Sequence, residues 1–261
     1  MQKSAVITGG ASGLGEACAR RFAADGALVW ILDANAERAA AITADITVAG
    51  GAARSAAVDV ADDAALEACA GRIRAETGAP DILVTSAGIL ETVSTVLDAD
   101  MALHDRVWAV NYRGTVATCR SFGRLMREAG RGAIVTIGST NSFSALPLPA
   151  YGPSKTAILR LTQILAVELG RHGVRVNGVA PTYVLTPAMQ ARIDKGERDP
   201  AAIRASGALD MLVRPENVAD VVAFLCSDGA AAITGVMLPI DAGFAAAVTY
   251  KSFAGGVPWQ D

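Results

Sequence analysis

The chain contains little histidine, cysteine or aromatic residue, and these shortages exclude several kinds of site. Of its 261 residues, two are histidine and four are cysteine, and 5% are aromatic. His104 and His172 are isolated, so a histidine-based catalytic triad or zinc site lacks ligands, and no two cysteines have metal-ligand spacing. We therefore predict no metal site, and we interpret the cysteines as buried thiols in a reducing cytoplasm.

Long apolar runs and an excess of positive charge are also missing. Glycine, aspartate or arginine interrupts every apolar run before the roughly 18 residues of a membrane span, and the N-terminus has no signal-peptide pattern. The net charge is −3 and the isoelectric point is near 5.5, so we predict no membrane and no nucleic-acid partner. Hydrophobic residues make up 52% of the chain, which is enough for a large core.

Short runs rich in valine and isoleucine alternate with longer stretches of helical spacing. These runs are apolar on both faces, as buried parallel strands are. The predicted strands are Ala5–Thr8, Leu28–Asp33, Ala53–Asp59, Ile82–Ser86, Ala133–Ser139, Val174–Ala180 and Val236–Asp241. The predicted helices are Leu14–Asp25, Glu37–Val48, Asp62–Glu76, Met101–Ala129, Ala150–His172 and Pro215–Ser227. This alternation predicts an α/β fold: a single-domain, Rossmann-type, doubly wound parallel sheet of about seven strands with helices on both faces.

Two segments depart from the alternation. Residues 187–214 are polar and irregular, and a loop of such length in a compact domain is usually a functional lid. We therefore assign residues 1–244 to one domain that includes this segment, residues 187–214, as a substrate lid. Residues 245–261 form a tail whose aromatic residues, Tyr250, Phe253 and Trp259, indicate docking at an interface or over a site.

A glycine-rich turn, Thr8–Gly15, separates the first predicted strand from the first predicted helix. Its glycines let the backbone turn tightly and bring amide groups close to a pyrophosphate, and the helix N-terminus adds partial positive charge. Because the strand–turn–helix context is present, we predict a dinucleotide site here. The residues assigned to it are Gly9, Ser12, Gly13, Leu14 and Gly15.

Asp33 ends the second predicted strand, where a carboxylate can accept hydrogen bonds from the adenosine ribose and repel a 2′-phosphate. The next residues, Ala34 and Asn35, offer no cation to such a phosphate. The sequence therefore favours NAD over NADP. The alternative is that Asp33 only caps the helix that begins near Glu37.

Small or acidic residues also follow the third and fourth predicted strands. Asp59, followed by Val60, is placed to accept a hydrogen bond from the adenine amino group, although a helix cap ahead of Asp62 explains its spacing equally well. Ser86, Ala87 and Gly88 permit close approach of a cofactor, and they also suit a tight turn.

Tyr151 and Lys155 lie four residues apart in a predicted helix, so they share one face. The free pKa of a tyrosine hydroxyl is about 10. A nearby ammonium group lowers that pKa and makes the phenol usable as an acid or base.

Taken together, these motifs resemble those of the classical short-chain dehydrogenase/reductase family over about residues 4–244. The resemblance rests on Thr8–Gly15, Asp33, Asp59-Val60, Ala87-Gly88, Val110-Asn111, Ile137-Gly138-Ser139, Tyr151 with Lys155, Asn177 with Pro181, Thr186, Arg214-Pro215-Glu216 and Ile233-Thr234-Gly235.

The resemblance implies proton-coupled hydride transfer with NAD. Tyr151 exchanges a proton with the substrate oxygen, Ser139 orients that oxygen, and Lys155 lowers the pKa of Tyr151 and binds the nicotinamide ribose. Asn111 holds a water that links Lys155 to solvent; taken alone, it could equally be a helix kink. The remaining cofactor contacts implied are Pro181, Thr182, Val184 and Thr186.

The chain departs from the family pattern in three places. Thr85-Ser86 replaces the usual Asn-Asn, Thr182 replaces a glycine after Pro181, and the interval from Ser139 to Tyr151 is one residue shorter. A rebuilt loop would let Ser142 or Thr140 take the place of Ser139.

The substrate pocket is expected above the nicotinamide, with mostly apolar walls and no arginine or lysine placed for an anion. Its predicted walls are Leu90, Asn141, Phe143, Leu146, Tyr183 and Met189. We therefore expect a small neutral secondary alcohol and its ketone as substrates.

The sequence is also compatible with other functions. Within the family, the alternatives are a sugar or polyol dehydrogenase and a cis-dihydrodiol dehydrogenase; an enoyl reductase is disfavoured because those enzymes space tyrosine and lysine further apart. A non-catalytic dinucleotide-binding regulator is the alternative from another class. The resemblance also implies a homotetramer, or a homodimer, that uses the two long helices and the last helix and strand as contacts.

Overall fold

Seven parallel strands form one sheet in the order β3-β2-β1-β4-β5-β6-β7 in this computed structural model, which describes residues 2–258. The strands are β1 (Ser4–Thr8), β2 (Leu28–Asp33), β3 (Ala52–Ala57), β4 (Ile82–Thr85), β5 (Gly132–Ile137), β6 (Val174–Pro181) and β7 (Met237–Ile240). The predicted doubly wound parallel sheet is confirmed, and each strand lies within two residues of its predicted bounds.

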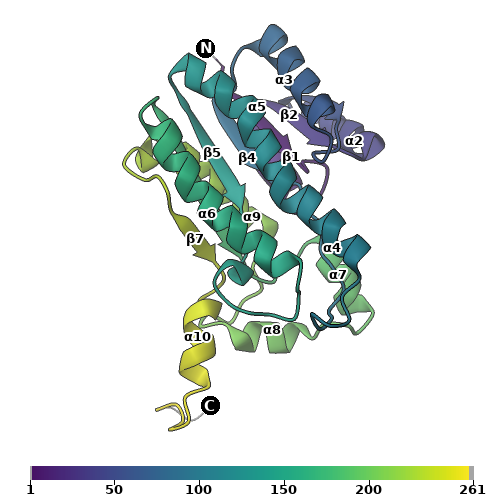
Figure 1. Cartoon of the computed structure of the whole chain (residues 1–261), viewed down its shortest axis with the longest axis vertical. Coiled ribbons are helices and arrows are strands. Elements are labelled where there is room, and N and C mark those ends of the chain that lie inside the picture. The colour runs from purple at the N-terminus through teal and green to yellow at the C-terminus, as the bar shows by residue number, and fades with distance from the viewer. Residues whose placement is uncertain (1, 259–261) are drawn as a thin grey trace.

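Helices cover both faces of this sheet (Figure 1). They are α1 (Gly13–Ala24), α2 (Ala36–Val48), α3 (Asp63–Thr77), α4 (Met101–Val107), α5 (Gly114–Ala129), α6 (Tyr151–Gly170), α7 (Pro187–Asp194), α8 (Pro200–Ser206), α9 (Pro215–Cys226) and α10 (Phe244–Lys251). Three shorter turns are η1 (Trp108–Arg113), η2 (Thr140–Ser142) and η3 (Asp228–Ala230).

Alternating strand residues build two separate cores. Ile7 of β1 packs with α1, α2 and α9 on one face, whereas its neighbour Val6 packs with α3, α5 and α6 on the other. The five inner strands are buried on both faces and are nearly continuous apolar runs, which explains why the sequence pattern located them; the edge strands β3 and β7 are partly exposed.

The long predicted helix over residues 101–129 is interrupted. A π-helical turn, η1, separates α4 from α5 and contains the buried Asn111. Such turns are frequent at functional sites because the wider backbone winding redirects a side chain.

The 187–214 segment is also more ordered than its irregular sequence indicated. Thr186 and Asp199 cap two short helices, α7 and α8, and Pro187 and Pro200 occupy the first turn of each. These Thr-Pro and Asp-Pro pairs were the available sequence signal, but α7 and α8 bury none of their residues completely, so no apolar periodicity marked them.

The C-terminal tail begins with a helix. α10 starts at Phe244, one residue before the predicted boundary, and lies beside α8 (Figure 1). Lys251 Nζ donates hydrogen bonds to the carbonyl oxygens of Ala205 and Gly207, each 2.6 Å away. Of the predicted docking aromatics, Trp259 lies outside the described residues. No helix in residues 2–258 has the length and apolar character needed to cross a bilayer.

Candidate active site

A cleft of about 680 Å³ lies at the carboxyl ends of β1 and β4, where the strand order reverses. This switch point is the usual ligand site of a doubly wound sheet. The predicted cofactor residues that line the cleft are Gly9, Ser12, Gly13, Leu14, Asp33, Asp59, Val60, Ser86, Ala87, Gly88, Tyr151, Lys155 and Thr186.

The glycine-rich turn has the geometry that a pyrophosphate needs. Gly9 and Gly13 have positive φ angles of 65° and 52°. A Cβ atom on Gly9 would lie 2.6 Å from the Cα of Ala87, so only glycine allows the two loops to meet. Ser12 forms no side-chain cap on α1, which leaves the first amide groups of the helix available to an anion. These features fit a dinucleotide.

Asp33 stabilises the glycine-rich turn through its carboxylate. Its Oδ2 accepts a hydrogen bond from Ala11 N at 3.1 Å, and its Oδ1 accepts one from Asn35 N at 2.9 Å. The cap of α2 is Asn35, whose side chain accepts from Arg38 N. The alternative that Asp33 caps this helix is therefore wrong, and its carboxylate faces the cleft.

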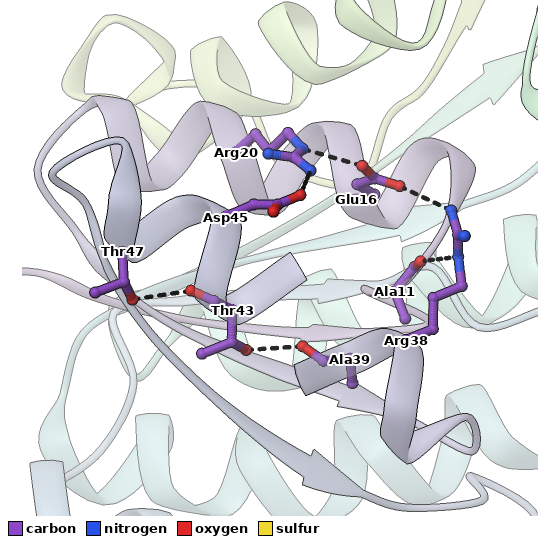
Figure 2. Close-up of polar contacts among 8 residues, drawn as sticks. All are labelled: Ala11, Glu16, Arg20, Arg38, Ala39, Thr43, Asp45 and Thr47. Carbon is purple, nitrogen blue, oxygen red and sulfur yellow. Dashed lines mark hydrogen bonds and ion pairs between the residues drawn. The ribbon is translucent and has the colours of Figure 1, made fainter. Parts of the chain in front are cut away.

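Arg38 also lines the cleft, so a cation is present near Asp33 although the two residues that follow Asp33 in the sequence carry none. Its Nε donates to Ala11 O at 2.8 Å, and its Nη2 lies 3.4 Å from Glu16 Oε2 (Figure 2). Glu16 also pairs with Arg20, which reaches Asp45 on α2. The α1–α2 network thus holds a guanidinium group beside the carboxylate expected to select the cofactor.

Asp59 has two partners. Its Oδ1 accepts from Ala61 N at 2.9 Å, and its Oδ2 pairs with Arg106 Nη2 at 2.8 Å. The backbone hydrogen bond from Ala61, followed by that from Arg106, holds the pKa of the Asp59 carboxyl below its usual range. The cap of α3 is Asp62, so the alternative of Asp59 as that cap is wrong.

Tyr151 and Lys155 lie together in the first turns of α6. Lys155 Nζ is 5.4 Å from the centroid of the Tyr151 ring and donates to Ile137 O at 2.8 Å. Burial lowers the pKa of the Lys155 amine to about 8. Burial also raises the pKa of the Tyr151 hydroxyl, and a side-chain hydrogen bond with Ser139 lowers it. Burial outweighs this hydrogen bond, so the Tyr151 pKa lies above its usual value, whereas the sequence predicted that Lys155 would lower it.

Asn141 orients the hydroxyl group of Ser139. Ser139 Oγ accepts from both the backbone and the side-chain nitrogen of Asn141, each at 3.1 Å. With two donors on this oxygen, the serine proton is directed away from Asn141 and is available to Tyr151. Ser142 Oγ donates instead to Lys155 O at 2.8 Å, so in the shortened loop it braces α6 while Ser139 faces the phenol.

Asn111 is completely buried behind the strand end that carries Gly88. Its Oδ1 accepts from Ile89 N at 2.8 Å, and its Nδ2 donates to Ile89 O at 3.0 Å. A Cβ atom on Gly88 would approach both Asn111 Oδ1 and Lys155 Nζ, at 3.4 and 3.8 Å. Asn111 therefore fixes the loop that starts at Ile89 and lies close to the lysine.

A second cavity of about 280 Å³ adjoins the cleft, and Tyr151 and Leu90 line both. The predicted walls that line it are Leu90, Asn141, Leu146, Tyr183 and Met189, together with Ser139 and Thr182. Phe143 differs from the prediction: it is 50% exposed and lies outside the lining, because the turn at η2 directs it outward.

Three charged residues of this cavity were missed. Arg192 of α7 and the nearby Arg198 line it, so the expectation that no arginine faces the pocket is wrong. Glu91 is 5% exposed and accepts hydrogen bonds at the start of α6. No motif in the sequence marked these side chains, because their positions depend on how the segments after β4 and β6 fold against Tyr151.

The remaining predicted cofactor residues lie around the cleft or behind it. Thr186 caps α7 through Met189 N, Val184 is buried and bridges to Val213, and Gly15 packs against the Gly9 backbone. Pro181 ends β6, and Thr182 lines the second cavity rather than the cleft.

Comparisons with known proteins agree with this geometry. A family model described as enoyl-(acyl carrier protein) reductase matches residues 9–245. D-threitol dehydrogenase of Mycolicibacterium smegmatis is 39% identical over 243 residues, covering 93% of this chain and 92% of the relative. Cis-4-hydroxycyclohexanecarboxylate dehydrogenase of Sinomonas cyclohexanicum is 36% identical over 250 residues, covering 94% and 97%.

A solved structure gives the same result for the fold. A crystal structure described as ribose-5-phosphate isomerase from Brucella melitensis superposes with a TM-score of 0.92 and 36% identity, covering 99% of this chain and 98% of that one. With the glycine turn, the Tyr151–Lys155 pair and the parallel sheet in place, the chain belongs to the short-chain dehydrogenase/reductase family of oxidoreductases.

Proposed function

We propose that this protein is an NAD-dependent dehydrogenase that interconverts a neutral secondary alcohol, with polyols as the favoured class, and its ketone. The observation that carries the proposal is the position of Tyr151, which lines both the dinucleotide cleft and the adjoining cavity. A substrate oxygen bound in the cavity would meet the phenol at the place where the nicotinamide end of the cleft opens. Similarity to the relative named D-threitol dehydrogenase supports a hydroxylated substrate.

The residues divide the chemistry as follows. NAD supplies the hydride acceptor when bound. Tyr151 Oη takes the proton of the substrate hydroxyl during oxidation and returns it during reduction. Ser139 holds the substrate oxygen, and the buried ammonium of Lys155 stabilises the phenolate. Asn111 completes the route by which the proton leaves towards solvent. The alcohol loses one hydride and one proton, so the products are the ketone, NADH and a proton.

NAD is proposed over NADP because of Asp33. Its carboxylate would accept from the two ribose hydroxyls and oppose a 2′-phosphate. Arg38 is nearby, but Glu16 and Ala11 O engage its guanidinium group.

The test is a substrate panel with the purified protein. Neutral polyols, simple secondary alcohols and hydroxy acids are assayed with NAD and with NADP through the absorbance of the reduced cofactor. We expect NAD-linked oxidation of neutral alcohols, polyols among them. Activity confined to anionic substrates, or only with NADP, would contradict the proposal.

Arg192 and Arg198 favour a second candidate, a hydroxylated carboxylic acid, because both guanidinium groups line the substrate cavity. The relative named cis-4-hydroxycyclohexanecarboxylate dehydrogenase supports this class. The hydroxy acids of the panel decide between the two candidates. An enoyl thioester is added to the panel because the matching family model is described as an enoyl reductase. NADH binding without turnover of any substrate would favour a non-catalytic dinucleotide-binding regulator.

The pH profile provides a further prediction. Oxidation requires the Tyr151 phenolate, whose pKa is raised by burial, so kcat/KM should increase as the pH rises. Lys155 loses its charge as the pH passes its pKa of about 8, which removes the stabilisation of the phenolate. We expect the rise to bend near that pH. Profiles of the wild type and Lys155→Met test this: a bend that persists in the variant contradicts the assignment.

We also propose a homotetramer in a reducing cytoplasm. All four cysteines are buried free thiols. Val167 of α6 is 79% exposed and Leu238 on the edge strand β7 is 40% exposed, as subunit contacts would be in an isolated chain.

Deletion of residues 245–261 should raise KM by several-fold, because it removes the hydrogen bonds of Lys251 to the end of α8. A several-fold change corresponds to about 1 kcal/mol, the usual net contribution of one hydrogen bond. If the tail reaches a neighbour, the molar mass in light scattering should fall as well. The matched control, Lys251→Met, should raise KM without changing the mass. Unchanged mass and KM after the deletion would rule out both roles of the tail.

A further inference from the structure

Glu91 places a buried carboxylate between the catalytic helix and the substrate cavity. It follows β4 and is 5% exposed. Its Oε1 accepts hydrogen bonds from Ala150 N at 2.7 Å and from Tyr151 N at 2.6 Å. These two amides begin α6, so the carboxylate occupies the positive end of a 20-residue helix.

The second oxygen of this carboxylate is not used in the same way. Within residues 2–258, Glu91 Oε2 accepts no hydrogen bond and forms no ion pair with Arg192 or Arg198. This oxygen is not enclosed by the protein, so its acceptor positions are open to a donor from the cavity. Because Glu91 lines the substrate cavity, a ligand there is the available donor.

Two other residues of the cavity wall also carry an oxygen without a partner. Asn141 Oδ1 and Thr182 Oγ1 are buried without a hydrogen-bond partner in the described part of the chain, and both residues line this cavity. Thr182 is one of the departures from the family pattern. Both of these oxygens are enclosed in the wall, so Glu91 Oε2 is the one unpartnered oxygen of the three that a ligand in the cavity can reach, besides Ser139 and Tyr151, which hold the reacting group.

This arrangement favours substrate hydroxyl groups over other chemistry. A purely apolar alcohol would leave Glu91 Oε2 without a donor, and a carboxylate beside Glu91 would be repelled. A second substrate hydroxyl group can donate to this oxygen and is compact enough to fit beside Tyr151. A site built to accept hydrogen bonds from substrate hydroxyls discriminates strongly against analogues that lack them.

We infer that Glu91 determines specificity: its Oε2 accepts a hydrogen bond from a polyol hydroxyl other than the one oxidised, while its Oε1 holds the start of the catalytic helix. This inference rests on the proposed alcohol dehydrogenase activity and narrows its substrate class to polyols. Glu91 acts on the substrate directly and on Tyr151 only through the backbone.

The test compares D-threitol with cyclohexanol in the wild type and Glu91→Gln. Glutamine keeps an oxygen for the two amides of α6 but replaces the second acceptor with a donor and removes the charge. We expect the ratio of kcat/KM for threitol to that for cyclohexanol to fall by about tenfold or more, which is about 1.4 kcal/mol, chiefly through a higher KM for threitol. The matched control is Glu168→Gln, an exposed position on α6, the helix that Glu91 contacts.

The outcomes separate the two proposals. A parallel loss on both substrates, as expected if Glu91 only caps α6, would overturn the role in specificity. Cyclohexanol preferred over threitol by the wild type would also overturn it and leave the dehydrogenase intact. No reduced cofactor with any alcohol would instead remove the proposed function itself.

Discussion

Replacing Tyr151 with phenylalanine should lower kcat/KM for alcohol oxidation by about 10²–10⁴-fold, the usual contribution of a positioned acid or base. The variant keeps the aromatic ring that lies over Lys155, with Nζ 5.4 Å from its centroid, and removes only the hydroxyl between Ser139 and the substrate. Affinity for NADH, measured by fluorescence titration, should remain close to that of the wild type.

The matched control is Tyr112→Phe. Tyr112 lies on η1 and lines neither the cleft nor the adjoining cavity, so its substitution should leave kcat/KM unchanged. Comparable turnover by Tyr151→Phe and the wild type would show that the proton passes elsewhere.

Replacing Asp33 with asparagine should lower the preference for NAD over NADP by at least about tenfold. A hydrogen bond to a charged group contributes about 1.5–3 kcal/mol, and each 1.4 kcal/mol is about a factor of ten. The substitution weakens the hold on the ribose and removes the charge that opposes a 2′-phosphate. It also leaves Arg38, which lines the same cleft, free of the adjacent negative charge.

Arg38 makes this prediction specific. The double variant Asp33→Asn with Arg38→Ala should lose most of the gain towards NADP, because the nearby guanidinium is then absent. Thermal unfolding is the control for stability, since Asp33 Oδ2 also holds Ala11 N. An equal loss with both cofactors would mean that Asp33 only supports the turn, and a wild type that prefers NADP would contradict the assignment outright.

The strands and the cofactor turn could be predicted because their signals are local. Buried parallel strands are apolar on both faces, and Gly9 must be glycine where its backbone meets Ala87. Tyr151 and Lys155 meet because the helix period places residues four apart on one face.

The substrate cavity depends on contacts that no local pattern records. The position of the Glu91 carboxylate is fixed by hydrogen bonds from two backbone amides about 60 residues away, those of Ala150 and Tyr151. Arg192 reaches the cavity from a helix without a fully buried face, and Phe143 points outward because η2 turns the shortened loop. The π-helical turn at Asn111 changes the winding without changing the composition.

The most direct measurement of the central claim is transfer of a deuterium label. A substrate alcohol deuterated at its carbinol carbon is oxidised with NAD, and the reduced cofactor is analysed by mass spectrometry and NMR. The account predicts one deuterium at C4 of the nicotinamide, and at least about 10²-fold less labelled cofactor in the Tyr151→Phe reaction over the same time. Reduced cofactor without the label, or no reduced cofactor from any alcohol, would contradict it.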